Sequence, residues 1–114
     1  MGLILEGSAV RVEEVRGLMK SLGARRSEIA VYLALLRLRG DQPVSAIVSA
    51  DGLSEKTVRS ALAALLDRGL VVRTGRGRGT RYRAKGVRTL MHLVRKKVEE
   101  GVREIFIHLQ YRSS

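Results

Sequence analysis

The segment that decides the fold lies at residues 45–73, SAIVSADGLSEKTVRSALAALLDRGLVVR. Residues 45–50 suit a short helix with a small apolar side, and the Asp-Gly pair that follows suits a tight turn. A longer helix is predicted from the N-cap Ser54 to about Arg68, because serine hydroxyls satisfy free N–H groups at helix starts. Gly69 then supplies the left-handed residue that commonly ends a helix. The segment therefore predicts two helices joined by a tight turn.

The hydrophobic period changes from helical to alternating at the end of this segment. Residues 70–73 and 81–84 predict two short strands, with Val72 and Tyr82 pointing inward and the neighbouring arginines outward. The glycine-rich residues 74–80, TGRGRGT, would close the hairpin. A short helix, a turn, a longer helix and a hairpin, in that order, are typical of a winged helix-turn-helix. We therefore predict a mostly α (α+β) fold with a two-stranded wing.

Two further helices are predicted before this motif. The first runs from Ser8, as its N-cap, to Leu22, with apolar residues at helical spacing along one face. The second runs from about Arg25 to Arg39. A short extended piece at residues 43–44 would connect it to the motif.

A long helix is predicted after the wing, from Val87 to Gln110. Its apolar residues are spaced by four, three, four, four, three and four positions: Val87, Met91, Val94, Val98, Val102, Ile105 and Leu109. The pattern repeats every eleven residues, about 3.67 per turn, so the stripe stays nearly straight along a helix of roughly 36 Å. The preceding domain is too small to cover such a length. One alternative is that the stripe folds back onto its own domain.

We therefore predict two units, a DNA-binding domain at residues 8–85 and a dimerisation helix at residues 86–110. The expected dimer interface consists of the stripe after its first residue: Met91, Val94, Val98, Val102, Ile105 and Leu109.

The charge of the chain indicates a polyanionic partner. Lys and Arg number 22 against 11 acids, a net charge of +11. From Arg68 to Lys97 there is no acid, and half of all basic residues fall in this span. Double-stranded DNA is the expected partner, because the basic span includes the wing and follows the expected reading helix.

The predicted reading helix would place its N-terminal half in the major groove. Its candidate DNA contacts are Ser54, Lys56, Thr57, Arg59, Ser60 and Ala63. The candidate contacts in the wing are Arg73, Arg76, Arg78, Arg81 and Arg83. The alternatives are a solvated helix face and a hairpin that only adds solubility. A phosphate-binding glycine loop is disfavoured, because a strand rather than a helix follows the glycines. A disordered Arg-Gly segment is disfavoured because such segments are usually longer and terminal.

Other classes of protein are disfavoured by composition. The chain has no cysteine, which excludes disulfides and thiolate chemistry, and no apolar run approaches the ~20 residues of a membrane span. Its start has no signal-peptide pattern, so a soluble cytoplasmic protein is expected. The only histidines, His92 and His108, lie sixteen residues apart without a third ligand, so neither a metal nor another cofactor is expected. No nucleophile is paired with a base, so an enzyme is not expected.

The chain also resembles a known family. Residues 18–38, LMKSLGARRSEIAVYLALLRL, followed by residues 45–73, are similar to the N-terminal DNA-binding domain of archaeal TrmB-like transcription regulators. The resemblance covers about residues 18–84, and Glu28 and the LLDRGLV exit into the wing are among its most specific parts. Arg25 departs from the family, because Ser or Thr is usual there. A terminal helix in place of the family's large sugar-binding domain resembles small archaeal regulators that dimerise through such helices.

Together these observations predict a dimeric, sequence-specific regulator of transcription that binds two DNA half-sites. The runner-up is a chromatin-like architectural protein that uses the same arginines on DNA of any sequence. A winged-helix module that binds another protein is disfavoured by the charge of +11.

Overall fold

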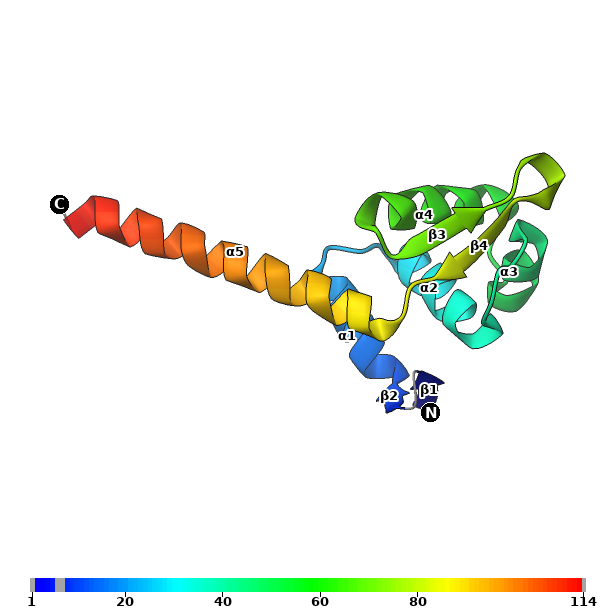
Figure 1. The fold of residues 1–114 in the computed structure, drawn as a ribbon, viewed down its shortest axis with the longest axis horizontal. Helices are drawn as coiled ribbons and strands as arrows, with labels where there is room; N and C mark the ends of the chain where they lie inside the picture. Colours follow the sequence, from blue (N-terminus) through cyan, green and yellow to red (C-terminus); the bar gives the residue numbers. More distant parts are fainter. Residues whose placement is uncertain (1, 6–7, 114) are drawn as a thin grey trace.

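Five helices and two small antiparallel sheets make up the computed structural model, which describes residues 2–5 and 8–113 (Figure 1). The helices are α1 (Val12–Ser21), α2 (Arg26–Leu38), α3 (Val44–Asp51), α4 (Glu55–Arg68) and α5 (Val87–Ser113). The strands are β1 (Gly2–Leu5), β2 (Ser8–Arg11), β3 (Val71–Thr74) and β4 (Arg81–Ala84), and a short 3₁₀ turn spans Gly77–Gly79. This is the predicted winged helix-turn-helix, with β3 and β4 as the wing.

The core is built around α2. Every residue from Val31 to Leu36 is buried, as expected for a helix that is apolar on most of its surface. Helices α3 and α4 and strand β4 all pack against α2. This arrangement leaves the opposite face of α4 uncovered.

The helix-turn-helix follows its local sequence signals. Ser54 Oγ accepts a hydrogen bond from the Thr57 N–H (3.1 Å), so the predicted N-cap of α4 is confirmed. Gly69 ends α4 with φ of 77°, in the left-handed region that the prediction required. Leu53 and Val58, at the spacing of a hydrophobic staple, both pack in the core. In the turn itself, Asp51 Oδ1 accepts from the Leu53 N–H (3.0 Å).

The wing has a different inner face from the one predicted. Strand β3 begins at Val71, which is buried, whereas Val72 is only half-buried. The prediction for Val72 was therefore wrong, and that for Tyr82, which is buried, was right. Val71 packs because α4 contacts β3 and fixes which of its faces turns inward. The prediction of an extended piece at residues 43–44 is right for Pro43, which is extended, and wrong for Val44, which begins α3. Gln42, just before them, forms a bridge with Tyr82 through two 2.8 Å backbone hydrogen bonds.

The junction between the wing and α5 is held from both sides. The Lys85 N–H donates to the Leu70 carbonyl (2.8 Å), and the Lys85 carbonyl accepts from Tyr32 Oη (2.7 Å). Leu70 precedes β3 and Tyr32 belongs to α2. The start of α5 is thus attached to both the wing and the centre of the core.

Helix α5 projects away from the rest of the molecule (Figure 1). The chain measures 59 × 31 × 22 Å along its principal axes. Near the start of α5, Val87 and Leu90 are buried in the core, and Leu93 and Val94 pack partly against it. The predicted stripe did not include Leu90, which is buried in the same core as Val87, the first residue of the stripe.

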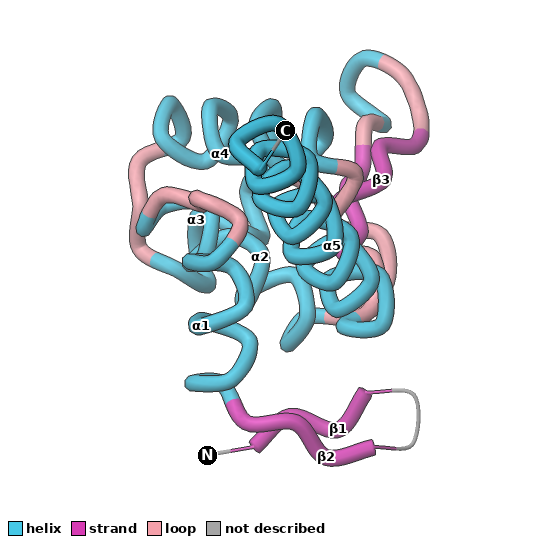
Figure 2. Tube along the Cα trace, turned by 90° about the vertical axis from the view of Figure 1, so that its left-hand side faces the viewer, coloured by secondary structure: helices cyan, strands magenta, loops and turns pink. Residues whose placement is uncertain are grey.

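The N-terminal prediction was partly wrong. The helix expected over residues 8–22 is a strand as far as Arg11, and α1 begins only at Val12. Strand β2 pairs with β1 in an antiparallel hairpin, which lies beyond the start of α1 (Figure 2). The apolar run at residues 3–5 supplies a pairing partner, and the β-branched Val10 suits a strand better than a helix.

Candidate nucleic-acid interface

Helix α4 presents a polar face to solvent. Four residues bury its other side: Val58, Ala61, Leu62 and Leu65. Leu66 lies at the edge of this buried side and is half-buried. The predicted contact residues Ser54, Lys56, Arg59, Ser60 and Ala63 are all exposed, and Thr57 is half-buried beneath the Ser54 cap. The structure therefore places the predicted residues on one accessible helix face.

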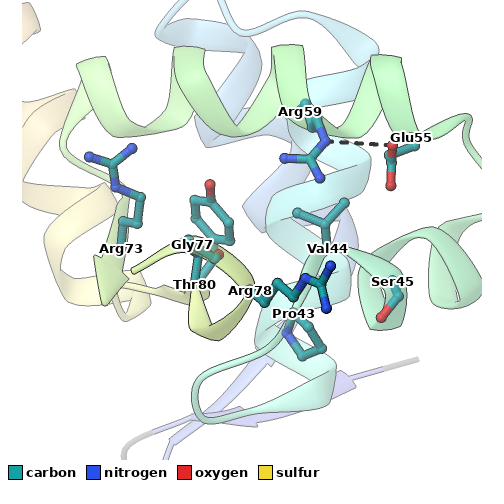
Figure 3. Close-up of a pocket in the computed structure, with 10 residues that line it drawn as sticks. Pro43, Val44, Ser45, Glu55, Arg59, Arg73, Gly77, Arg78 and Thr80 are labelled. Atoms are coloured by element: carbon teal, nitrogen blue, oxygen red, sulfur yellow. Dashed lines mark hydrogen bonds and ion pairs between the residues drawn. The ribbon is translucent and has the colours of Figure 1, made fainter. Parts of the chain in front are cut away.

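A cleft of about 440 Å³ lies between this helix and the wing (Figure 3). Its lining comes from three regions of the chain: Pro43, Val44, Ser45, Glu55, Arg59, Arg73, Gly77, Arg78, Thr80 and Tyr82. Arg59 extends from α4, and Arg78 extends from the wing toward the same space (Figure 3). Three guanidinium groups, those of Arg59, Arg73 and Arg78, therefore line one concave surface.

Arg73 lies on a different face of the wing from the one predicted. In the register of the hairpin, Arg73 pairs with Tyr82, while Val72 pairs with Arg83 and Thr74 with Arg81. Paired residues of neighbouring strands point to the same side of a sheet. Arg73 therefore shares a face with the buried Tyr82 and lines the cleft, whereas Arg81 and Arg83 lie on the opposite face. The five wing arginines do not form one surface.

The tip of the wing is a tight glycine turn. Gly75 has φ of 78°, and a Cβ built on it would lie 2.1 Å from the carbonyl oxygen of Gly79. Only glycine fits this position without a shift of backbone. The turn exposes Arg76 and Arg78. It is closed by a hydrogen bond from the Gly79 N–H to the Arg76 carbonyl (2.9 Å).

Two acidic residues lie close to arginines of α4 and the wing. Glu55 lies 3.7 Å from Arg59, one turn away on α4, and both side chains are more than half exposed. Asp41 lies 3.8 Å from Arg83. Glu55 was not identified from the sequence, although its position in the first turn of α4 is visible there.

A buried ion pair supports the reading helix from behind. The Arg68 Nε donates to Glu28 Oε1 at 2.7 Å, and Glu28 is only 3% exposed. Arg68 also donates to the carbonyls of Leu22 (2.8 Å) and Gly23 (3.0 Å), while Glu28 Oε2 accepts from the Arg25 N–H (3.0 Å). The end of α4 is thus tied to the connection between α1 and α2. The Glu28 side chain thus accepts a hydrogen bond from the Arg25 N–H at the start of α2. Arg25 occupies the position where the family usually has Ser or Thr.

Other kinds of site receive no support from the described part of the chain. Within residues 2–5 and 8–113, no group of three His, Asp or Glu side chains is placed to bind a metal ion. His92 and His108 are both exposed on α5. None of the helices in these ranges is long and apolar enough to cross a membrane.

The fold and the basic cleft define a winged helix-turn-helix protein of the class that regulates transcription by binding DNA. Residues 18–88 match the family described as sugar-specific transcriptional regulator TrmB, so the chain belongs to the TrmB family. The members of this family are transcription regulators and not enzymes. No curated protein sequence matches the chain.

Several solved structures share the fold. A possible transcriptional regulator from Methanosarcina mazei Go1 superposes with a TM-score of 0.71 at 14% identity, covering 97% of this chain and 96% of that one. The ST1889 protein from Sulfolobus tokodaii has a TM-score of 0.64 at 20% identity, covering 82% of this chain and 99% of that one. The homodimeric winged helix-turn-helix domain of Mb0332 from Mycobacterium bovis has a TM-score of 0.50 at 23% identity, covering 91% and 95%.

Proposed function

We propose that this chain is a dimeric transcription regulator that binds a specific sequence of double-stranded DNA. The observation that carries the proposal is the cleft, where arginines from the reading helix and from the wing line one surface beside the exposed face of α4. A duplex seated there would meet α4 and the wing together.

Helix α4 would enter the major groove, which is wide enough to admit a helix. Lys56 and Arg59 would reach guanine edges or phosphates, and Thr57 and Ser60 would bond to either base edges or the backbone. The small side chain of Ala63 would let the helix approach the base pairs closely, or would touch a thymine methyl group. The exposure of this helix face supports these roles.

The wing would divide its arginines into three groups with different contacts. Arg76 and Arg78 at the tip would enter the minor groove or hold phosphates. Arg73, on the cleft side, would contact the backbone of the DNA strand that runs between α4 and the wing. Arg81 and Arg83, on the other face, would contact the outer backbone. The register of the hairpin supports this division.

Dimerisation would use the apolar stripe of α5. Val98, Val102 and Ile105 are each 58–63% exposed, and three exposed aliphatic side chains along one helix face favour a second helix as their cover. We propose residues 8–85 as the DNA-binding unit and residues 86–110 as the dimerisation helix, whose first two turns also complete the core of the first unit. The homodimeric state of the Mb0332 domain supports a dimer by analogy.

The experiment that tests the proposal is competition binding at near-physiological salt, followed by fluorescence anisotropy. Duplex DNA from upstream of the protein's own gene competes against scrambled duplex of equal length and composition. We expect a preference of roughly a thousandfold or more for one upstream segment. A survey of random duplexes that finds no preferred sequence would overturn specific binding.

A second candidate function is favoured by the net charge of +11 and by the acid-free span from Arg68 to Lys97, which holds half of all basic residues. An architectural protein would use the same arginines on phosphates alone. Its affinity would fall steeply with salt and would not depend on sequence. The competition experiment separates the two candidates.

A further inference from the structure

We infer that the two copies of α5 pair antiparallel, crossing at Val98, so that the winged units lie at opposite ends of the helix pair. The inference rests on the proposed dimer and adds the direction of its pairing. The occupant of the exposed face of α5 is therefore a second copy of this chain, in a defined orientation.

The spacing of the stripe allows this pairing. On either side of Val98 the apolar residues follow at four, three and four positions, so the pattern is the same in both directions. An antiparallel partner centred there would place the partner's Ile105 against Met91 and the partner's Val102 against Val94. Parallel pairing would also align the stripe, so the choice between the two directions depends on the features beside it.

The charges along α5 select the antiparallel direction. The first part of the helix, residues 87–97, contains Arg88, Arg95, Lys96 and Lys97 and no acid. The acids of the helix, Glu99, Glu100 and Glu104, all follow Val98. Charges beside an apolar seam determine which orientation two helices adopt. A parallel pair would place basic residues against basic residues, whereas an antiparallel pair places Arg95 near the partner's Glu99.

The exposed apolar residues at the C-terminal end of α5 are a second, independent reason for antiparallel pairing. Ile105, Phe106 and Ile107 are consecutive and 48–63% exposed. Successive residues of a helix point about 100° apart, so this end is apolar well beyond one stripe. Parallel pairing would leave Phe106 and Ile107 in solvent, far from either winged unit. Antiparallel pairing brings them beside the start of the partner's α5, where the partner's winged unit can cover them.

The resulting separation also suits the proposed DNA site. In an antiparallel pair centred at Val98, the two copies of Val87 lie 22 residues apart along the axis, which corresponds to roughly 33 Å at ~1.5 Å per residue. Half-sites one turn of DNA apart are separated by about 34–36 Å. Parallel helices would bring the two starting points to within about 10 Å of each other.

Disulfide trapping tests the direction, because the chain contains no cysteine of its own. Three single variants are prepared: Met91→Cys, Ile105→Cys and Val98→Cys. In the antiparallel pair, Met91→Cys mixed with Ile105→Cys, after exchange of subunits, should form a disulfide-linked heterodimer on mild oxidation. Either variant alone should stay unlinked, since its two thiols lie ~21 Å apart along the axis. Val98→Cys should link on its own in either direction.

The outcomes separate the direction from the dimer itself. If Ile105→Cys alone forms a disulfide-linked homodimer, and the mixture gives no linked heterodimer with Met91→Cys, the antiparallel arrangement is overturned and the dimer itself remains. If light scattering shows that the unmodified protein is a monomer, the dimer proposal fails and the inference fails with it. If the protein is dimeric but Val98→Cys does not link, the interface lies outside α5, which also overturns the inference.

Discussion

Gly75 is the residue on which the tip of the wing depends. With φ of 78° and the Gly79 carbonyl where its Cβ would lie, Gly75→Ala forces the turn to open. We expect this variant to lose DNA affinity while its melting temperature changes little, because the turn lies outside the core. Gly79→Ala is the matched control, since nothing lies within 4 Å of its Cβ and its φ is not positive. Anisotropy and thermal melting of both variants check the prediction; equal affinity would place the tip away from DNA.

Arg59 is expected to read bases. Arg59→Ala should cost roughly 1–3 kcal/mol on the preferred duplex and less on scrambled DNA, because a base contact discriminates between sequences. Arg103→Ala, which removes the same charge from an exposed position on α5, should weaken both duplexes similarly and only slightly. Competition binding measures both losses. Equal losses for Arg59→Ala on the two duplexes would assign Arg59 to a phosphate.

Glu28 is expected to be the most important charged residue for stability. Glu28→Ala leaves Arg68 without its buried partner and the Arg25 N–H without its acceptor. Removing one side of such a pair costs about 3 kcal/mol of unfolding free energy. Glu55→Ala, which breaks an exposed pair, should cost at most about 1 kcal/mol. Urea unfolding compares the two, and similar midpoints would mean that the Glu28 pair contributes little.

At the scale of an element, the wing is expected to act through phosphates. Arg76→Ala combined with Arg78→Ala should weaken binding to every sequence and flatten the dependence of log K on log salt by roughly two. Lys96→Ala combined with Arg103→Ala, an equal loss of charge on α5, should change the slope much less. Titrations at four or five salt concentrations check this. An unchanged slope would mean that the wing does not touch DNA.

The elements that the sequence predicted well are those with local signals. The boundaries of α4 follow from Ser54 and Gly69, which act on neighbouring backbone groups. The inner face of the wing could not be predicted, because contacts of β3 with α4 and of β4 with α2 decide whether Val71 or Val72 turns inward. The contact of Glu28 with Arg68 spans 40 positions and has no local signal. Arg73 was assigned to the wrong face for the same reason as Val72, because the face follows from the register of the hairpin.

At the scale of the whole molecule, the exposed stripe of α5 predicts that folding and assembly are separable. Val98→Glu with Ile105→Glu should give a folded monomer by light scattering, since neither side chain contributes to the core. This monomer should bind one half-site and lose the added affinity of two linked sites. His92→Glu, exposed on α5 but off the stripe, is the control that should remain dimeric. A dimer that survives the double substitution would place the interface elsewhere.

The double attachment of Lys85 has a mechanical consequence. Its N–H is bonded beside β3 and its carbonyl is bonded to Tyr32 in the core, so the wing cannot swivel freely against the first turns of α5. We therefore expect the wing and α5 to move together, as one rigid unit joined at Lys85. A small change in the angle at which two such helices cross would be transmitted as a larger displacement at the wing tips. The affinity of the protein for two sites on one duplex would then respond to anything that bends or tightens the pair, even at a distance from the DNA.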